Sequence, residues 1–322
     1  MAEPIQIGLL GAWVVGGGTL DVLWRRGAQI AGRIGRPLAV KRVLVREPGK
    51  PRRVNIPAEL LTTDPSAVLE DPEIAIVVEL LGGLEPARSY IATALRAGKH
   101  VVTANKDVIA THGREIFALA NEKDVTNFFE GSVGGGIPVI GVLRHDLVAN
   151  EITSIQAIIN GTTNFILTAM AQGQEYAQAL REAQELGYAE PNPQNDVEGI
   201  DAAYKLAILS TLAFRTYVSP QDVPHFGITY LEAQDFRYAA EMGYVIKLLA
   251  SARLVDGKIE AGVYPALLPE AHHLASVKGV FNAVLIDGDE IDTLMLYGRG
   301  AGAKPTASAV VADICAVAND IV

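Results

Sequence analysis

Short apolar runs alternate with segments of helical pattern through about residue 140 of the chain. The runs have the length of strands and cover residues 5–10, 40–45, 74–80, 100–103 and, more weakly, 125–129. Strands that are apolar along their whole length are typical of a parallel sheet covered by helices on both faces. The pattern therefore predicts an α/β fold with a Rossmann-type, doubly wound parallel sheet over residues 1–145.

The pattern changes after residue 149. Candidate strands then cover residues 151–158, 245–254, 259–267, 281–286 and 294–297, with helical segments between the first two of them. Strands joined by short turns favour a mixed or antiparallel sheet with helices on one face. We therefore expect a second, α+β domain over residues 146–302, followed by a last helix at about residues 305–318 within the segment 303–322.

Length, charge and cysteine content narrow the class of protein. A chain of 322 residues exceeds what one hydrophobic core usually supports, which fits two domains. The formal net charge of −10 argues against a nucleic-acid partner, because binding phosphates needs clustered excess cations. The single cysteine, Cys315, lies in an apolar pattern that favours a buried thiol over a disulfide or a metal ligand. With no apolar run near the ~20 residues of a membrane span and no signal sequence, we expect a soluble, cytoplasmic protein.

An acidic segment with one lysine precedes an apolar helical pattern at residues 186–205. If the part after Gly199 is helical, Asp201 and Lys205 stand four positions apart and share one face. Glu190 and Asp196 lie in the loop before that helix. Such a cluster suits a small zwitterion, with carboxylates facing its ammonium group and the lysine facing its reacting oxygen. On these residues alone, an ordinary solvated pair of helices is an equally good interpretation.

A glycine loop, residues 8–18, follows the first strand and opens a helix. In this context, backbone N–H groups can bind the pyrophosphate of a dinucleotide. The fingerprint has glycine at Gly11 and Gly16, but Trp13 replaces the middle glycine that normally lets the backbone approach the pyrophosphate. Two interpretations stay open: the indole turns away and the Val14 and Val15 amides hold the phosphates, or the loop is remodelled and binds the cofactor poorly.

The end of the second predicted strand carries a basic loop. Arg46 follows the strand, and further cations lie close behind it at Lys50, Arg52 and Arg53, with Glu47 as the only nearby acid. An acid in this region binds the ribose 2′-OH of NAD, whereas a basic group binds the 2′-phosphate of NADP. The loop therefore favours NADP over NAD, and the alternative is an exposed basic loop without a ligand.

Four blocks of residues occur in the order seen in one enzyme family. They are residues 102–107 (VTANKD), 129–138 (FEGSVGGGIP), 160–167 (NGTTNFIL), and 297–302 (YGRGAG) with 305–308 (PTAS). Together with residues 186–205, they resemble homoserine dehydrogenase over nearly the whole chain. The resemblance implies NAD(P)-dependent interconversion of L-homoserine and L-aspartate 4-semialdehyde, in the aspartate-derived biosynthesis of threonine and methionine. It also implies a homodimer formed through the second domain, and a last helix that returns to the nucleotide-binding domain.

The resemblance assigns roles to individual residues. Lys205 is the implied proton donor and acceptor, Asp201 orients it, and Lys106 is a second catalytic cation near the nicotinamide. The implied substrate ligands are Glu190, Asp196, Asp201, Gly161, Thr162 and Tyr188. The implied cofactor ligands are Gly11, Val14, Val15, Gly16, Arg46, Lys106, Gly187 and Gly302.

The resemblance also implies a sodium-type site in the glycine-rich stretch after Glu130. Its ligands would be the Glu130 carboxylate and the carbonyls of Val133, Gly135 and Ile137, oxygen donors that suit a hard cation. None of these groups carries proton chemistry, so the cation would be structural. Gly131 stands where the family leads one to expect alanine. A glycine-rich hinge without a metal is the alternative.

Two further expectations concern regulation and the possible loss of enzyme activity. The family commonly continues into a C-terminal regulatory domain, whereas this chain stops at Val322, directly after the last predicted helix. The resemblance is therefore to the catalytic core, and feedback control by an amino acid bound to such a domain is expected to be absent. The alternative function is a cofactor-impaired pseudoenzyme, in which Trp13 blocks the cofactor while Glu190 and Asp196 still bind an amino acid.

Overall fold

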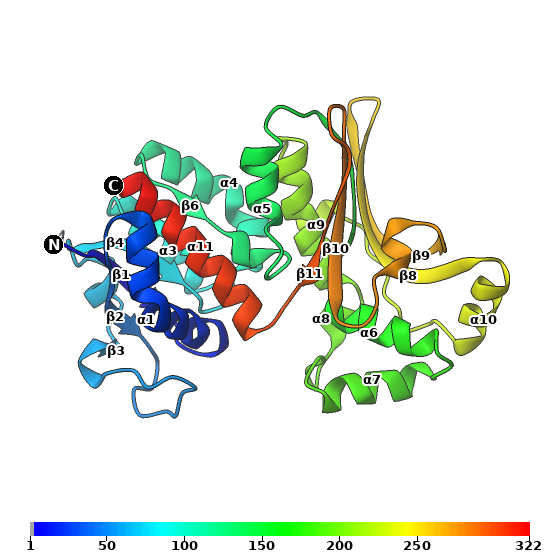
Figure 1. Ribbon diagram of the computed structural model, residues 1–322, viewed down its shortest axis with the longest axis horizontal. Coiled ribbons are helices and arrows are strands. Elements are labelled where there is room, and N and C mark those ends of the chain that lie inside the picture. Colours follow the sequence, from blue (N-terminus) through cyan, green and yellow to red (C-terminus); the bar gives the residue numbers. More distant parts are fainter. Residues whose placement is uncertain (1–2) are drawn as a thin grey trace. The chain divides into compact units, whose positions relative to one another are not determined.

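The apolar runs near the N-terminus form a six-stranded parallel sheet in the computed structural model, which describes residues 3–322 (Figure 1). The strands are β1 (Ile5–Leu10), β2 (Leu38–Leu44), β3 (Leu61–Thr62), β4 (Ile74–Glu79), β5 (His100–Thr103) and β6 (Asn127–Phe128). Their order across the sheet is β3-β2-β1-β4-β5-β6, and each neighbouring pair is parallel. The strand order reverses between β1 and β4, and ligands of such sheets bind at the carboxyl ends of the strands at that point.

The glycine loop after β1 approaches neighbouring backbone closely. Gly11 has a φ of +93°, and a Cβ there would lie 2.8 Å from the Leu80 carbonyl oxygen. A Cβ on Gly16 would lie 2.0 Å from the Gly11 carbonyl oxygen. Both positions therefore require glycine. Trp13 has a φ of −87°, so the backbone at the middle position accepts a side chain.

Helices pack on this sheet and belong to the same compact unit. They are α1 (Val14–Ile34), α2 (Ser66–Leu69), α3 (Ala87–Arg96), α4 (Lys106–Glu122) and α11 (Ala303–Ile321), with short 3-10 turns η1 (Ala58–Leu60) and η2 (Glu130–Ser132). The C-terminal helix α11 packs against α1, where a Cβ on Gly18 would lie only 3.0 Å from the Ala303 carbonyl oxygen. Gly18 therefore permits this close contact between the first and the last helix of the chain.

A second compact unit contains an antiparallel sheet of five strands, ordered β11-β10-β7-β8-β9. The strands are β7 (Ile152–Ile158), β8 (Tyr244–Val255), β9 (Lys258–Pro269), β10 (Phe281–Gly288) and β11 (Asp292–Arg299). β8 and β9 are long and pair from Tyr244 with Pro269 to Val255 with Lys258. This unit spans Ile137–Ala301, and the parallel-sheet unit comprises the residues up to Gly136 together with Gly302–Val322.

Helices of the second unit lie between β7 and β8 in the chain, apart from α5 and the π-helical turn η3, which precede β7. They are α5 (Val139–Gly141), η3 (Val142–Asp146), α6 (Gly161–Met170), α7 (Tyr176–Glu185), α8 (Gln194–Val197), α9 (Ile200–Ala213) and α10 (Ala233–Glu241), with the 3-10 turn η4 (Pro220–Asp222). A second 3-10 turn, η5 (His273–Ser276), lies between β9 and β10. α6 packs on β8 and β10, and α9 packs on β7, β8 and β9. These contacts bring the N-terminal ends of α6 and α9 to the same sheet.

The predicted fold class is confirmed: a doubly wound parallel sheet is joined to an antiparallel α+β sheet. The strands at residues 5–10 and 100–103 have the predicted bounds, and the other predicted strands differ by a few residues at their ends. The pattern did not predict β3, because a strand of two residues shows no periodicity. Among residues 3–322, no helix is long and apolar enough to cross a bilayer.

One lysine is buried beneath α6 without a carboxylate partner in the described structure. Lys247 of β8 is 4% exposed, and its ammonium donates to Asn164 Oδ1 at 3.1 Å and to the Val277 carbonyl. The Asn164 amide in turn donates to the Gly279 and Phe281 carbonyls. Burial lowers the pKa of Lys247 to about 8, and the charge of Lys278 adds to the fall.

This burial predicts a pH dependence of stability. Between about pH 8 and pH 10.5, the unfolded chain keeps a proton that the folded chain has lost, so the free energy of unfolding rises with pH, by about 3 kcal/mol. Lys247→Met removes the titrating group and should flatten that rise, measured by urea unfolding at several pH values across the window. Lys258→Met, at an exposed position, is the control. An equal rise in Lys247→Met and the wild type would contradict the prediction.

Candidate active site

The N-terminus of α1 presents backbone N–H donors at the end of β1. Its N-cap residue is Trp13, which makes no side-chain capping hydrogen bond, and the first turn of the helix contains no acid. The first N–H groups of a helix have no partner within the helix and carry partial positive charge. The Val14 and Val15 amides are therefore placed to bind an anion such as a pyrophosphate.

The basic loop after β2 lines a cavity of about 560 Å³ beside this helix end. The lining residues are Gly11, Ala12, Trp13, Leu44, Val45, Arg46, Glu47, Lys50, Arg52, Thr63, Leu80, Leu81, Pro86 and Tyr90. Arg46 and Lys50 are exposed. Arg52 instead donates to the carbonyls of Glu47, Pro48 and Lys50, so its guanidinium holds the loop together. The cavity therefore has glycine-loop backbone on one side and cations on another.

A buried carboxylate at the end of β4 was not among the predicted site residues. Glu79 is fully buried, accepts from the Thr103 hydroxyl at 2.6 Å and from the Leu81 N–H at 2.7 Å, and so ties the carboxyl end of β4 to that of β5. Burial raises the pKa of Glu79, although these hydrogen bonds oppose the shift. An acid closing the apolar run 74–80 was the available signal.

The two remaining predicted features of this unit lie near α4 and η2. Lys106 is the first residue of α4, directly after the N-cap Asn105, and its ammonium lies 3.5 Å from Asp107. The buried Glu130 begins η2, and its N–H donates to Asp313 of α11 at 2.8 Å. A Cβ on Gly131 would lie 2.9 Å from the Ala104 Cβ. Close packing therefore explains glycine where the family resemblance suggested alanine.

The glycine-rich stretch after Glu130 includes two residues in the left-handed backbone region that glycine adopts without strain. Gly134 and Gly135 have φ values of +75° and +56°, and Val133 and Ile137 are buried. Within residues 3–322, no group of three or more histidine, cysteine, aspartate or glutamate side chains could hold a metal ion. A cation here would therefore depend on backbone carbonyls and the single Glu130 carboxylate. Gly302, the N-cap of α11, has a φ of +119°.

In the second unit, α9 holds the predicted lysine and carboxylate pair on one face. Lys205 donates to Asp201 Oδ2 at 2.6 Å and to the Ile159 carbonyl at 3.0 Å. Each of the two side chains is 13% exposed. The spacing of four residues on a helix therefore brings them together as predicted, and the carbonyl at the end of β7 fixes the ammonium from a second side.

Asn160 joins this pair to Asp196, and it was not among the predicted site residues. Its amide donates to Asp196 Oδ1 at 2.7 Å and to Asp201 Oδ2 at 2.9 Å. Its side-chain oxygen, Oδ1, accepts from the Thr163 N–H at 2.9 Å and so caps α6. The Asn-Gly-Thr-Thr sequence signalled the cap, but not the second use of the same side chain.

Asp196 is a perturbed acid within this cluster. Burial raises its pKa, and the charge of Asp201 adds to the rise, while the Asn160 amide and the Lys205 ammonium oppose it. Perturbed acids that lie beside a fixed lysine are common in binding and catalytic sites. The cluster of Asn160, Asp196, Asp201 and Lys205 is therefore the best candidate for the site of chemistry in this unit.

The other predicted substrate ligands lie at the edge of the cluster. The Thr162 hydroxyl donates to the Tyr188 carbonyl at 2.7 Å, and the exposed Tyr188 ring packs 5.2 Å from that of Phe165. Gly187 has a φ of +74° and follows the end of α7. Glu190 is exposed, and within residues 3–322 its carboxylate makes no hydrogen bond or ion pair. The structure therefore brings Asp196 to the pair but leaves Glu190 separate.

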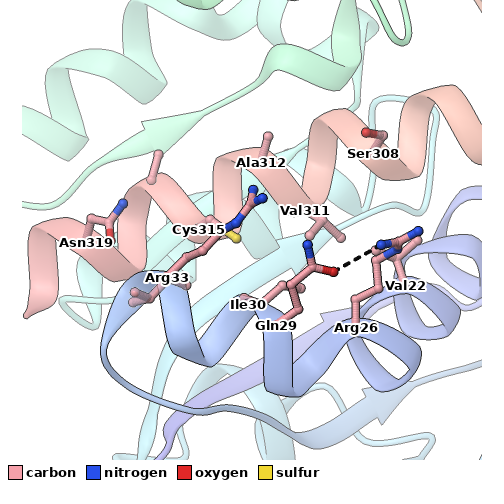
Figure 2. A pocket seen from close by; sticks show the side chains of 12 residues that line it. Val22, Arg26, Gln29, Ile30, Arg33, Ser308, Val311, Ala312, Cys315 and Asn319 are labelled. Atoms are coloured by element: carbon pink, nitrogen blue, oxygen red, sulfur yellow. Dashed lines mark hydrogen bonds between the residues drawn. The ribbon is translucent and has the colours of Figure 1, made fainter.

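A groove between α1 and α11 is unlike either region (Figure 2). Its volume is about 710 Å³, and its lining includes Arg26, Arg33 and Cys315 but no carboxylate. Arg26 donates to Gln29 at 3.1 Å, and the Arg33 guanidinium reaches toward Cys315 in Figure 2. Burial raises the pKa of this half-buried thiol. Cys315 is therefore a thiol that ionises poorly, in a groove whose lining contains no carboxylate.

The two units together define a class of protein. A doubly wound sheet with a glycine loop at its switch point is typical of dinucleotide-binding enzymes. A lysine fixed by a carboxylate and a carbonyl suits proton transfer to an oxygen. The chain is thus an oxidoreductase of the dinucleotide-binding α/β class.

Comparisons with known proteins identify the family. Residues 11–130 match the model for the NAD-binding domain of homoserine dehydrogenase, and residues 138–315 match the model for homoserine dehydrogenase. A homoserine dehydrogenase from Synechocystis is 50% identical over 96% of this chain and 72% of its own length. The crystal structure of the Thiobacillus denitrificans homoserine dehydrogenase has a TM-score of 0.92 at 49% identity, covering 98% of this chain and 74% of the other.

A more distant structure carries a bound cofactor. It is a hyperthermophilic archaeal homoserine dehydrogenase in complex with NADPH, with a TM-score of 0.81 at 30% identity, covering 97% of each chain. The chain described here belongs to the homoserine dehydrogenase family.

The two uses of Asn160 predict separable effects of substitution. Asn160→Ala removes the cap of α6 and should lower the free energy of unfolding by about 1–3 kcal/mol, since lost caps and lost buried hydrogen bonds each cost about 1 kcal/mol. Asn160→Ser keeps a capping oxygen but has no amide for Asp196 and Asp201. In urea unfolding, Asn160→Ser should be about 1 kcal/mol more stable than Asn160→Ala. Both variants lack the amide and should lose catalytic activity alike. Equal stability of the two variants would contradict the capping role.

Proposed function

We propose that this protein interconverts L-homoserine and L-aspartate 4-semialdehyde with NADP, and that Lys205 moves the proton at the substrate oxygen. The observation that carries the proposal is the hydrogen bonding of the Lys205 ammonium. It has three N–H donors, of which one binds Asp201 and one binds the Ile159 carbonyl. The third is left for a substrate oxygen, at an angle that the other two hold fixed.

The groups around Lys205 suit the amino-acid end of the substrate. Asp196 and Asp201 supply carboxylate oxygens for an ammonium or hydroxyl group, and Glu190 is proposed as a further, exposed acid for the ammonium. The Gly161 and Thr162 N–H groups open α6 and suit the substrate carboxylate. The Thr162 hydroxyl already donates to Tyr188, so the proposed carboxylate contact is made by backbone N–H groups.

The parallel-sheet unit contributes the cofactor site. When bound, the nicotinamide exchanges hydride with substrate C4. The Val14 and Val15 amides bind the pyrophosphate, and Arg46 and Lys50 attract the 2′-phosphate, which favours NADP over NAD. Lys106 supplies a second cation near the carboxyl end of β5, and Gly16, Gly187 and Gly302 are proposed as backbone contacts of the cofactor.

The direct test follows absorbance loss of NADPH and NADH during reduction of L-aspartate 4-semialdehyde. We expect turnover with NADPH to exceed that with NADH, and Lys205→Ala to lower kcat by about 10²- to 10⁴-fold while circular dichroism and the Kd for NADPH stay unchanged. Lys258→Ala, an exposed lysine of the same unit, is the control. Amino-acid binding without turnover by either cofactor would favour a pseudoenzyme damaged at Trp13, and a residual rate near wild type in Lys205→Ala would refute its role.

We propose in addition a structural sodium site formed by the Glu130 carboxylate and the carbonyls of Val133, Gly135 and Ile137. A buried carboxylate followed by glycines of positive φ is a donor set that fits a hard monovalent cation. The cation would neutralise Glu130 and order the loop, with no part in proton transfer.

Sodium should then stabilise the fold. A cation that binds only the folded chain raises the free energy of unfolding by about 2.7 kcal/mol at a hundredfold excess over its Kd. The measurement compares thermal midpoints in sodium chloride and in choline chloride at equal ionic strength, for the wild type and for Glu130→Gln, which should lose the difference. The same midpoint in both salts for the wild type would exclude the site.

A homodimer is part of the same proposal. Several large side chains on strands of the antiparallel sheet are exposed: Tyr244, Leu254, Tyr264, Leu267 and Tyr297. They lie on β8, β9 and β11, and exposed apolar side chains on a sheet are common at protein–protein interfaces. They support association of two chains through the second unit.

A further inference from the structure

Trp13 replaces the middle glycine of the fingerprint. Its side chain contacts the basic loop after β2, which is proposed to bind the cofactor's 2′-phosphate. The Lys50 ammonium lies 4.8 Å from the centre of the Trp13 ring, within the range of a cation–π contact. Trp13 is 59% exposed, so its indole lies over the surface and does not fill the core. The contact joins two segments that are 37 positions apart in the chain and come from different strand ends.

The basic loop is fixed at its ends and within itself. Val45 and Ile56 are buried at its two ends, and the Arg52 guanidinium binds three of the loop's own carbonyls. Residues 46–51 between these points are exposed. The loop is therefore a preformed unit, and the contact of Lys50 with the Trp13 indole connects it to the glycine loop.

Trp13 also lines two neighbouring cavities. The first, of about 560 Å³, includes Gly11, Arg46 and Lys50, and the second, of about 270 Å³, is formed by Trp13, Val14, Pro51, Arg52 and Arg53. Trp13 and Arg52 are common to both. The indole therefore lies where the glycine loop and the cations that favour a phosphate come closest.

We propose that Trp13 is a specificity-determining residue: by holding Lys50 it keeps the basic loop beside the glycine loop, and so favours dinucleotides that carry a 2′-phosphate. This inference rests on the proposed binding of NADP. The same side chain restricts the approach of a pyrophosphate to the loop backbone. Trp13 therefore lowers affinity for every dinucleotide while it raises discrimination between the phosphorylated and the unphosphorylated form.

The test measures binding of two cofactor fragments by calorimetry, 2′-phospho-ADP-ribose and ADP-ribose, which removes catalysis from the readout. In Trp13→Gly, ADP-ribose should bind more tightly than to wild type, whereas the ratio of the two Kd values should fall about two- to fivefold, the effect of losing an exposed cation–π contact. Trp13→Phe keeps a ring and should keep most of the ratio. Trp24→Phe, a tryptophan on α1 outside both cavities, is the matched control.

A double-mutant cycle with Lys50→Met separates positioning from local damage. If Trp13 acts through Lys50, Trp13→Gly should change the ratio little in the Lys50→Met background. An unchanged ratio in Trp13→Gly, or an equal effect of Trp13→Gly with and without Lys50, would overturn the inference while leaving the proposed function intact. Failure of both fragments to bind any folded variant would instead overturn the cofactor proposal on which the inference rests.

Fluorescence gives a second readout. In Trp24→Phe, Trp13 is the only tryptophan of the chain. Binding of 2′-phospho-ADP-ribose should change its emission, because the phosphate would bind the Lys50 ammonium that lies over the indole. Binding detected by calorimetry without any change in Trp13 emission would count against the contact.

Discussion

The cluster of Asp196, Asp201 and Lys205 depends on a single amide side chain, that of Asn160. Asn160 has two hydrogens and an acceptor oxygen to offer; its hydrogens go to Asp196 and Asp201, and its oxygen goes to the first turn of α6. Two carboxylates that share one donor repel each other, and the hydrogens of the donor offset this repulsion. Because Asp201 in turn holds Lys205, the position of the lysine ammonium is coupled through Asn160 to the start of a helix.

A constraint of a different kind governs the parallel-sheet unit. Gly11 and Gly16 are required by the close approach of backbone to backbone, whereas position 13 lies at a negative φ with space for a side chain. The middle glycine of the fingerprint normally serves the ligand, and the other two serve the turn and the packing of the protein itself. Substitution by tryptophan is therefore compatible with the fold, and under the proposed function its consequences fall on the cofactor.

Several charged side chains that are buried or half-buried in the two units have a partner supplied by backbone. Glu79 accepts from the Leu81 N–H, and the ammonium groups of Lys205 and Lys247 donate to backbone carbonyls. The Asp313 carboxylate accepts from the Glu130 N–H. An unpaired buried polar group is costly, so these partners are what permit charged residues inside the protein. The cations of the basic loop differ from these groups, since Arg46 and Lys50 are exposed and remain available to a ligand.

Local pattern was sufficient for the fold class, for all strands but β3, and for the pairing of Asp201 with Lys205, because these follow from periods of two and of 3.6 residues. The glycine loop could also be predicted from the sequence, since the spacing of its glycines reflects backbone geometry. The burial of Glu79 and Lys247, the bridging by Asn160 and the contact of Trp13 with Lys50 were not readable. Each joins segments far apart in the chain, and such contacts depend on how strands and helices pack, which no local spacing encodes.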